Sequence, residues 1–429
     1  MRTAGQRDER EQTAGYEPSR RTGVVEIPAS LTEVRPVPDL FEYIILGAGC
    51  AGLSLCCYLL EQGVTDPILI LDQKERFEDD RTWCFWDVEP TPFSHLAIKR
   101  WNSWSIHAQN RHVVQTSERY PYLCLTARDF YRHALETIAA HPNVTLRLGE
   151  AAAGYKELPE ETVVATERRA YKARFVLDGR GLPPGSPLFE EARRDSAWVP
   201  QRFVGLRIRT ARPVFDPEVC KLMDFSVGQG RGLRFVYVLP FGTREALVEN
   251  VYLSETNLPL VEHRMEIFAY LESVYGLRPD EYVIDGEEHG YIPMTDYEFP
   301  RRLGERAYSI GMLGGGSRPS TGYTFVRIQR YCRALAAALV HGEELPNRTE
   351  SRRFGVLDAI FLRFMLRHPE RCPEVYARMF AGVPPESLVR FLTEKSTPAD
   401  ELRLIQALPK TPFLGISARM LFGDHHATR

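Results

Sequence analysis

The apolar residues in the first part of the chain gather into short uninterrupted runs. Residues 43–46 form one run, a glycine-rich segment follows at 47–52, and another run at 68–71 ends on Asp72. Uninterrupted apolar runs are typical of strands that are buried on both faces of a parallel sheet. The pattern therefore predicts a strand, a tight turn, a helix and a second strand, which together form a βαβ unit.

The hydrophobic pattern changes further along the chain. Residues 129–141 have helical spacing, and 174–178 form another buried strand. Apolar and polar residues then alternate from about 201 to 255, which predicts an antiparallel sheet with one covered face. Its strands are expected at 202–207, 234–239 and 246–249. From about residue 325 onward the spacing is helical, so the C-terminal part is expected to consist mainly of helices.

Composition sets limits on the kind of protein. Residues 1–38 are rich in Arg, Glu, Thr and Pro without apolar periodicity, which predicts a disordered tail. A net charge of −3 gives no basic excess, so nucleic-acid binding is excluded. The uncharged run at 43–60 is just long enough for a transmembrane helix. Its three glycines favour a strand, a turn and a helix instead.

The cysteines and histidines give no sign of a metal site. The eight cysteines include no Cys-x-x-Cys pair and no zinc-ligand spacing, and no signal peptide precedes them. A reducing cytoplasm fits this usage. His107 and His112 lie five residues apart but have no third ligand nearby in the sequence, so both are expected at the surface and no metal is predicted.

The segment 47–52 matches the glycine pattern that binds dinucleotides. Gly47 would permit the tight turn, Gly49 would let the backbone approach the pyrophosphate, and Gly52 would let the helix pack on the strand. The helix N-terminus would then offer unpaired N–H groups and a positive dipole end to the phosphates. Asp72, about 20 residues further on, is the acid expected to bind the ribose hydroxyl. The sequence therefore predicts a site for the ADP half of a dinucleotide.

A later segment favours FAD over NAD. Asp178 and Gly179 begin an Asp-Gly-Arg-Gly sequence that resembles the stretch beneath the cofactor in flavoproteins of the glutathione-reductase superfamily. We therefore expect an α/β fold with a Rossmann-like FAD-binding domain of that type, an antiparallel-sheet substrate domain and a helical C-terminal region. The expected parts are the tail at 1–38, the FAD-binding domain at 39–200 and 290–345, the substrate sheet at 201–289 and the helical region at 346–429.

Further motifs lie outside the dinucleotide site. The most specific are Arg-Thr-Trp-Cys-Phe-Trp at 81–86 and Pro-Ser-Thr-Gly-Tyr at 319–323, and supporting segments lie at 235–241, 246–249, 390–394 and 411–414. Together these motifs resemble the flavin-dependent lycopene cyclases of carotenoid biosynthesis. Flavin hydroxylases of this fold usually carry a late Gly-Asp pair, but this chain has Gly-Met-Leu-Gly-Gly-Gly-Ser at 311–317. That difference favours a cyclase over a hydroxylase.

The resemblance implies a particular reaction. An end group of the linear polyene lycopene is protonated, the carbocation closes a six-membered ring, and loss of a proton leaves a β-ionone ring without net oxidation. The resemblance also implies reduced FAD, with NAD(P)H as the reductant. Other enzymes of the carotenoid pathway are candidate partners. Such a site needs an acid, a dry apolar tunnel and electron-rich groups that tolerate a cation.

Glu249 is the candidate acid and base. It matches the first glutamate of the Phe-Leu-Glu-Glu-Thr motif of plant cyclases, whereas Asn250 and Val251 replace the next two residues. The role of a carboxylate pair is therefore in doubt. An apolar pocket would raise the pKa of this carboxyl and keep it protonated near neutral pH. The structural alternative is a solvated glutamate at the end of a strand.

The resemblance also assigns residues to the cofactor and the substrate. The expected cofactor contacts, besides the glycine turn and Asp72, are Arg81, Asp178, Gly179, Gly316, Thr321, Gly322 and Tyr323. The expected substrate contacts are Trp83, Phe85, Trp86 and Tyr237. Aromatic residues pack equally well in a core between sheets, and that alternative stays open.

A substrate as apolar as lycopene has to arrive from a membrane. The apolar residues Phe354, Leu357, Phe361, Phe364 and Met365 repeat at helical spacing beside several arginines. This pattern is typical of an interfacial helix, and equally of a helix packed on a core. We expect a cytoplasmic protein in peripheral contact with a membrane. Two other functions stay open, an FAD-dependent monooxygenase or desaturase of an apolar isoprenoid, and a flavin-binding pigment carrier.

Overall fold

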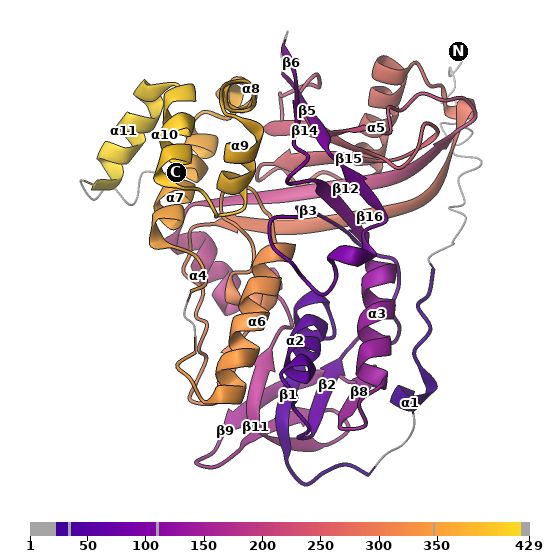
Figure 1. Ribbon diagram of the computed structural model, residues 1–429, viewed down its shortest axis with the longest axis vertical. Coiled ribbons are helices and arrows are strands. Elements are labelled where there is room, and N and C mark those ends of the chain that lie inside the picture. Colours follow the sequence, from indigo (N-terminus) through magenta and orange to yellow (C-terminus); the bar gives the residue numbers. More distant parts are fainter. Residues whose placement is uncertain (1–22, 33–35, 109–110, 346–347, 422–429) are drawn as a thin grey trace, which may run out of the picture.

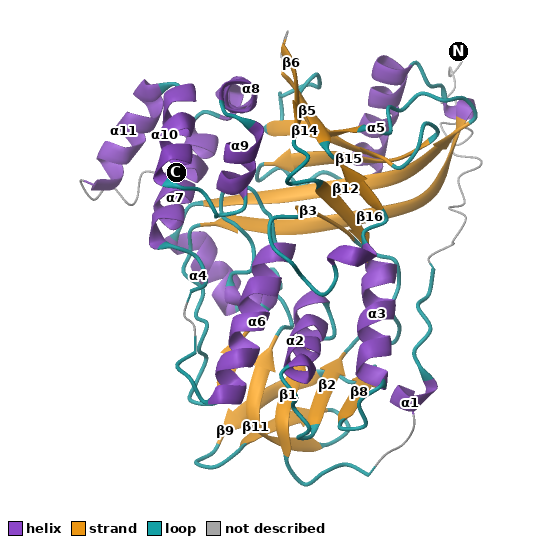
Figure 2. Ribbon diagram, in the orientation of Figure 1, coloured by secondary structure: helices purple, strands orange, loops and turns teal. Residues whose placement is uncertain are grey.

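The computed structural model describes residues 23–32, 36–108, 111–345 and 348–421. Within these residues the chain forms two seven-stranded sheets and one three-stranded sheet. The first sheet lies at one end of the molecule beneath α2, α3 and α6 (Figure 1). The second sheet crosses the other end, with α5 and the C-terminal helices around it (Figure 2).

The first sheet contains the predicted βαβ unit. Its strand order is β8-β2-β1-β11-β10-β9, and β17 also pairs with β11. The bounds are β1 Phe41–Leu46, β2 Ile68–Asp72, β8 Val144–Leu148, β9 Ala152–Glu157, β10 Thr162–Thr166, β11 Ala170–Asp178 and β17 Ala307–Ser309. Strands β8, β2, β1, β11 and β17 run parallel, whereas β10 and β9 pair antiparallel. This order brings the C-terminal ends of β1, β2 and β11 to one edge, where ligands of such sheets bind.

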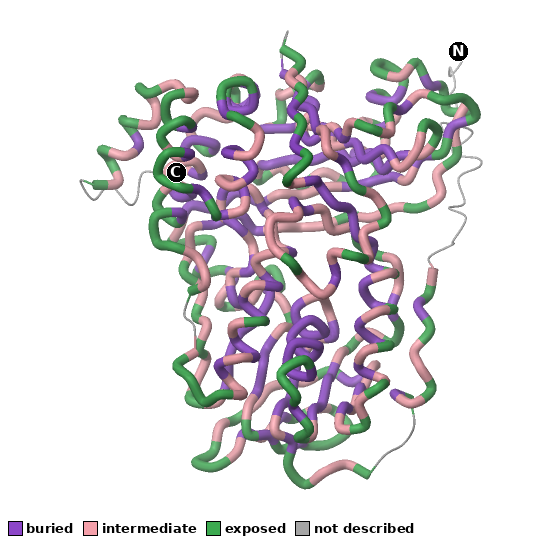
Figure 3. The backbone as a smooth tube through the Cα atoms, in the orientation of Figure 1, coloured by how far each residue is buried: buried purple, intermediate pink, exposed green. Residues whose placement is uncertain are grey.

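Three helices cover one face of the first sheet. These are α2 Cys50–Glu61, α3 Ala127–Ala139 and α6 Phe325–His341. Helix α2 packs between the other two and is buried over most of its length (Figure 3). The run at 43–60 is thus split between β1 and α2. No helix of the described residues is long and apolar enough to cross a membrane.

The second sheet has the strand order β16-β12-β15-β14-β13-β5-β6. Its bounds are β5 Ser103–Ala108, β6 Arg111–Thr116, β12 Trp198–Thr210, β13 Val219–Asp224, β14 Leu233–Pro240, β15 Glu245–Leu253 and β16 Tyr282–Thr295. Helix α5, Leu260–Tyr275, covers one face against β12 and β15. Because the sheet also takes β5 and β6, the assignment of the whole of 39–200 to the FAD-binding domain was wrong there. The sheet is also mixed, since β13 and β5 are parallel.

The three-stranded sheet and the remaining helices complete the fold. The small sheet consists of β3 Thr82–Trp86, β7 Tyr122–Thr126 and β4 Lys99–Trp101. Short helices are α1 Ala29–Thr32 and α4 Pro187–Asp195. The C-terminal helices are α7 Arg352–Arg367, α8 Cys372–Gly382, α9 Pro385–Leu392, α10 Pro398–Ala407 and α11 Lys410–Leu421.

Helix α7 packs on the protein rather than offering its apolar face to a membrane. Phe354, Phe364 and Met365 are buried, and the ring of Phe364 stacks on Phe413 of α11 at 4.5 Å between centroids. Of the two alternatives left open for residues 354–365, the structure shows the helix packed on a core. The same spacing serves both purposes, and here the protein core takes the apolar face.

Part of the predicted disordered tail is packed against the first domain. The backbone N–H of Val25 donates to the carbonyl of Phe77 at 3.0 Å, and Leu31 is buried. Val25 and Leu31 are therefore buried by contacts with the rest of the protein, which the sequence of the tail alone does not reveal. Residues 1–22 and 33–35 of that tail lie outside the described residues.

Candidate functional site

The glycine segment forms a tight turn between β1 and α2. Gly47 has a φ of +101°, which only glycine adopts readily. A Cβ on Gly52 would lie 1.9 Å from the carbonyl oxygen of Gly47, so a side chain there would force the helix away from the turn. No side chain caps the N-terminus of α2, and its first residues, Cys50 and Ala51, line a cavity together with Gly49. The helix end is therefore available to an anionic ligand.

Asp72 fixes this turn from the end of β2. Its carboxylate accepts hydrogen bonds from the backbone N–H of Ala48 at 2.6 Å and of Lys74 at 2.8 Å. A carboxylate has further lone pairs that can accept ribose hydroxyls. Asp72 does not itself line the cavity as Lys74 does, so its contact with a ribose stays a prediction.

Asp178 and Gly179 have different roles at the end of β11. The carboxylate of Asp178 is buried and forms a 2.7 Å ion pair with Arg180. Gly179 lines the cavity, and a Cβ on Gly47 would lie 2.8 Å from its carbonyl oxygen. The two turns thus meet closely, and backbone rather than the Asp178 side chain faces the cavity.

The opposite wall comes from the segment after β17. The 3₁₀ turn Gly311–Gly314 contributes Gly311 and Met312, and the following loop contributes Thr321, Gly322 and Tyr323. Gly322 has a φ of +72°. Gly316 does not line the cavity, and its contact with a cofactor stays a prediction. A Cβ on Gly316 would lie 2.8 Å from the carbonyl oxygen of Gly311. Gly316 therefore lets the chain pack closely on the 3₁₀ turn that lines the cavity.

A buried ion pair holds this loop. Arg318 is almost fully buried and its guanidinium lies 2.8 Å from the carboxylate of Asp358 on α7. The hydroxyl of Ser320 donates to the same carboxylate at 2.7 Å. Helix α7 therefore positions the loop that carries Thr321 to Tyr323.

The cavity has a volume of about 430 Å³ and joins the glycine turn to the second sheet. One end offers backbone N–H groups, glycine surfaces and the side chains of Lys74 and Arg81. This set fits the phosphates and ring system of a dinucleotide cofactor, because a close backbone approach and positive charge are both present. The other end offers β12, β14, β15 and β16 of the second sheet.

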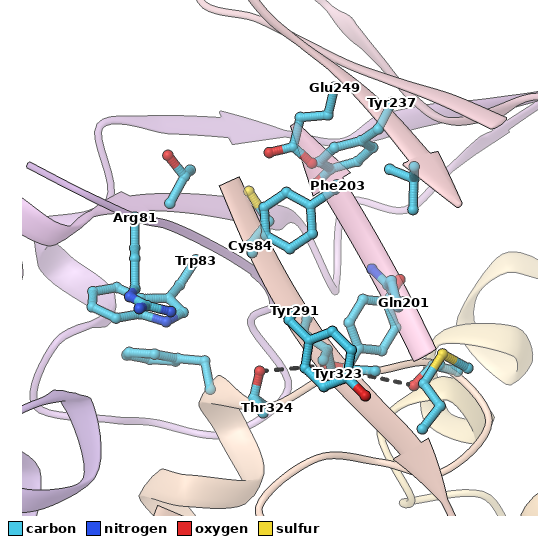
Figure 4. Close-up of a pocket in the computed structure, with 18 of the residues that line it drawn as sticks. Arg81, Trp83, Cys84, Gln201, Phe203, Tyr237, Glu249, Tyr291, Tyr323 and Thr324 are labelled. Carbon is cyan, nitrogen blue, oxygen red and sulfur yellow. Dashed lines mark hydrogen bonds between the residues drawn. The ribbon is translucent and has the colours of Figure 1, made fainter. Parts of the chain in front are cut away.

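Glu249 occupies the sheet end of the cavity (Figure 4). Glu249 lies on β15, where it is paired with Tyr237 of β14 on one side and with Gly205 of β12 on the other. Gly205 is paired in turn with Glu288 of β16. The four residues therefore form one row across the sheet, and the glycine between the two carboxyl groups leaves space for both. Asn250 put a carboxylate pair at 249 and 250 in doubt, whereas the structure brings Glu249 and Glu288 together as a pair.

Electrostatics favours a protonated carboxyl in this row. Burial raises the pKa of Glu249 well above its usual value, and the charge of Glu288 raises it further. Burial also raises the pKa of Glu288, although hydrogen bonds from Glu249 and Thr82 and the charge of Arg207 act in the opposite direction. Two carboxyl groups this close share protons, and the proton is held more firmly by Glu249. Because Glu249 is buried, the alternative of a solvated glutamate at a strand end does not hold.

Aromatic side chains line much of the cavity. They include Trp83, Phe203, Tyr237, Tyr323 and Tyr376, and the predicted contact of Trp83 and Tyr237 with a substrate stays a prediction. Figure 4 shows Tyr237 and Phe203 beside Glu249, with Tyr323 farther away beside Thr324. Their electron-rich faces can stabilise a nearby cation.

Phe85 and Trp86 do not line this cavity, and their contact with a substrate stays a prediction. Phe85 stacks on Phe325 at 4.6 Å between ring centroids. Trp86 is 1% exposed and packs edge-on against Trp104. Both lie in the core beside the cavity, which is the ordinary place for large aromatic residues.

Sequence reasoning missed Glu288, Gly205 and Phe203. A lone glycine within the alternating run 202–207 was a usable signal, because such a glycine often marks a close approach in a sheet. Glu288 gave no signal of its own, since its neighbour Glu287 has the same chemistry and faces α5 instead, where it pairs with Arg264.

Comparison with known proteins agrees with these features. Residues 42–418 match the family model described as lycopene cyclase protein. The lycopene beta-cyclase of Pantoea ananas is 26% identical over 395 residues, which cover 87% of this chain and 96% of that protein. The match spans both sheets and most of the C-terminal helices.

Solved structures show the same fold at low identity. A geranylgeranyl bacteriochlorophyll reductase-like protein from Thermoplasma acidophilum has a TM-score of 0.59 and 13% identity, with 89% of this chain and 99% of that chain covered. A halogenase in complex with FAD has a TM-score of 0.53 and 14% identity, covering 90% and 96%. These similarities confirm the predicted fold of FAD-dependent flavoproteins, and the family match confirms the resemblance. The chain belongs to the lycopene cyclase family.

Proposed function

We propose that this protein is a lycopene β-cyclase that converts linear end groups of lycopene to β-ionone rings by acid-base chemistry. The observation that carries the proposal is the buried carboxyl of Glu249, which faces an aromatic cavity joined to the dinucleotide turn. A carboxyl that stays protonated near neutral pH can donate to an alkene. The mainly apolar walls at this end would limit the water that could trap the cation before the ring closes.

FAD is the proposed cofactor, in its reduced form and with NAD(P)H as the reductant. Gly49, the first turn of α2 and the backbone at Gly179 would hold it, and Gly311, Thr321 and Tyr323 would lie on the other side. When bound, the reduced flavin would supply an electron-rich surface that stabilises positive charge. The residues of the chain itself place the substrate, exclude water and move the proton.

Pigment complementation tests the proposal. Expression in cells that accumulate lycopene should convert it to γ-carotene and β-carotene, and Glu249→Gln should abolish this while the flavin absorbance of the purified protein persists. Unchanged lycopene with wild-type protein would contradict the cyclase function. A product that gains oxygen or loses hydrogen would support the monooxygenase or desaturase, which the family match does not favour. Pigment that binds without turnover would indicate a carrier.

Peripheral membrane contact is proposed at the last two helices. Leu402, Ile405, Leu414 and Leu421 are each at least half exposed on α10 and α11, and Lys410 begins α11. Exposed apolar side chains with nearby basic residues suit an anionic lipid surface. All eight cysteines are free, which supports the proposed cytoplasmic location. Contact with other enzymes of the carotenoid pathway stays a prediction.

Vesicle sedimentation tests the membrane contact. The Leu414→Asp, Leu421→Asp double variant should bind vesicles of phosphatidylglycerol more weakly than the wild type. Leu158→Asp is the matched control, because Leu158 is also exposed but lies between β9 and β10 of the first sheet. Equal binding by all three proteins would place the contact elsewhere.

A further inference from the structure

The second carboxyl group of the cavity, Glu288, has no role in the function proposed so far. It lies on β16, directly across Gly205 from Glu249, and both glutamates line the cavity. A Cβ on Gly205 would lie 2.9 Å from Cγ of Glu249. The glycine therefore keeps the row open between the two carboxyl groups, and any larger residue would crowd Glu249.

The surroundings of the two carboxyl groups differ. The hydroxyl of Thr82 donates to Oε2 of Glu288 at 2.7 Å, and the guanidinium of Arg207 adds favourable positive charge. Both features stabilise the ionised form of Glu288. Glu249 is influenced by burial and by the charge of Glu288, and both favour its neutral form. Burial raises the pKa of both carboxyl groups, but these contacts favour the ionised form more at Glu288 than at Glu249, which suits Glu249 as the proton donor and Glu288 as the acceptor.

We propose that Glu288 is a second catalytic residue, the base that removes the ring proton after Glu249 has protonated the substrate. This inference rests on the proposed cyclase function. It assigns the two proton transfers of the reaction to two different side chains, held in one row of the sheet.

The proposed sequence conserves atoms and electrons. Glu249 gives its proton to the terminal carbon–carbon double bond, so a C–H bond forms and the adjacent carbon becomes cationic. The π electrons of the next double bond then form the ring bond and move the cation to a ring carbon. Glu288 takes a proton from the carbon beside that cation, and the electrons of the broken C–H bond form the ring double bond. No oxidant or reductant is consumed.

The same two carboxyl groups can restore the protonation states that the site had before the reaction. After the reaction Glu249 is ionised and Glu288 is protonated, which is the reverse of the favoured arrangement. The two carboxyl groups lie in one row on either side of Gly205, which gives the proton a short path back to Glu249. The next end group then meets the original state without a proton from solvent.

Substitution of Glu288 tests this role in the reduced holoenzyme, with lycopene supplied in phosphatidylcholine vesicles. Glu288→Gln should lower the cyclisation rate by roughly 100-fold or more, while flavin absorbance and melting temperature stay at wild-type values. Glu287→Gln is the matched control, because Glu287 pairs with Arg264 on the other side of the sheet, and it should retain the wild-type rate.

The pH profile separates a base from a residue that only positions Glu249. Wild type should lose activity at low pH, where Glu288 is protonated, and at high pH, where Glu249 is ionised. The residual activity of Glu288→Gln should lose the acidic limb. A Glu288→Gln rate equal to wild type, or a reduced rate that keeps the acidic limb, would overturn the inference. In both of those cases wild type still cyclises lycopene, whereas a wild type that does not would overturn the proposed function itself.

Discussion

The hydroxyl of Thr82 donates a 2.7 Å hydrogen bond to the carboxylate of Glu288. Thr82 belongs to β3 of the small sheet, and Glu288 belongs to β16 at the edge of the second sheet. The bond therefore joins the specific motif at 81–86 to the carboxyl pair. It gives this motif a function that its tryptophans alone do not explain.

Removal of the Thr82 hydroxyl should shift the acidic limb of the pH profile. Thr82→Val removes a hydrogen bond that stabilises the ionised form of Glu288, so the pKa of Glu288 should rise. A hydrogen bond to a charged group contributes about 1.5 to 3 kcal/mol, which corresponds to a shift of about one to two pH units. Activity should then be lost at higher pH on the acidic side. Thr82→Ser keeps the donor and should show the wild-type profile, and an unshifted profile for Thr82→Val would contradict this role.

A methyl group at Gly205 should disturb the carboxyl pair. Gly205→Ala places Cβ 2.9 Å from Cγ of Glu249, so Glu249 has to move. Because small displacements of catalytic groups are costly, cyclisation should fall about 100-fold. The control is Gly286→Ala in β16, where the nearest atom to a Cβ is 4.0 Å away. Equal rates for both variants in the lycopene assay would show that the spacing is unimportant.

Substitution of two glycines in the turn, Gly49 and Gly52, should have different effects. A Cβ on Gly49 meets nothing within 4 Å but enters the cavity, so Gly49→Ala should fold normally and lose flavin. Gly52→Ala would crowd the carbonyl of Gly47 at 1.9 Å and should lower both flavin content and melting temperature. Gly154→Ala in β9, where a Cβ also has open space, is the control. Full flavin content in Gly49→Ala would contradict the predicted cofactor position.

The ion pair between Arg318 and Asp358 should contribute strongly to stability. Asp358→Ala leaves a buried guanidinium without its partner, which costs about 3 to 5 kcal/mol in comparable pairs. Urea unfolding should show this as a lower midpoint. Asp285→Ala removes the partner of Arg209, whose side chain is 60% exposed, and should change the midpoint little. Similar midpoints for the two variants would contradict the role assigned to the buried pair.

The parts of the site that follow from local sequence were predictable. Gly47, Gly49 and Gly52 act within one strand-turn-helix unit, so their spacing in the sequence is enough to predict the shape of the turn. Glu249 was found through the resemblance, and its burial was not, because burial depends on strands that are distant in the sequence. The row that adds Glu288 needs the register of β15, β12 and β16 together, which no single segment encodes.

Large apolar side chains leave two interpretations open in a sequence. Phe85 and Trp86 were assigned to the substrate, and the apolar face of α7 was left open between a membrane and a core, because these side chains are large and apolar. The same property places them in a core. Periodicity shows that a face is buried, but it does not show which partner buries it.

The most direct test of the central claim is the mass and redox balance of the product. Purified protein with FAD, reduced by NAD(P)H without oxygen, is incubated with lycopene and the product is analysed by chromatography and mass spectrometry. We predict a cyclised product with the mass of lycopene, and no NAD(P)H consumed beyond that needed to reduce the flavin. A product heavier by oxygen or lighter by hydrogen, or NAD(P)H oxidation in step with turnover, would contradict acid-base cyclisation.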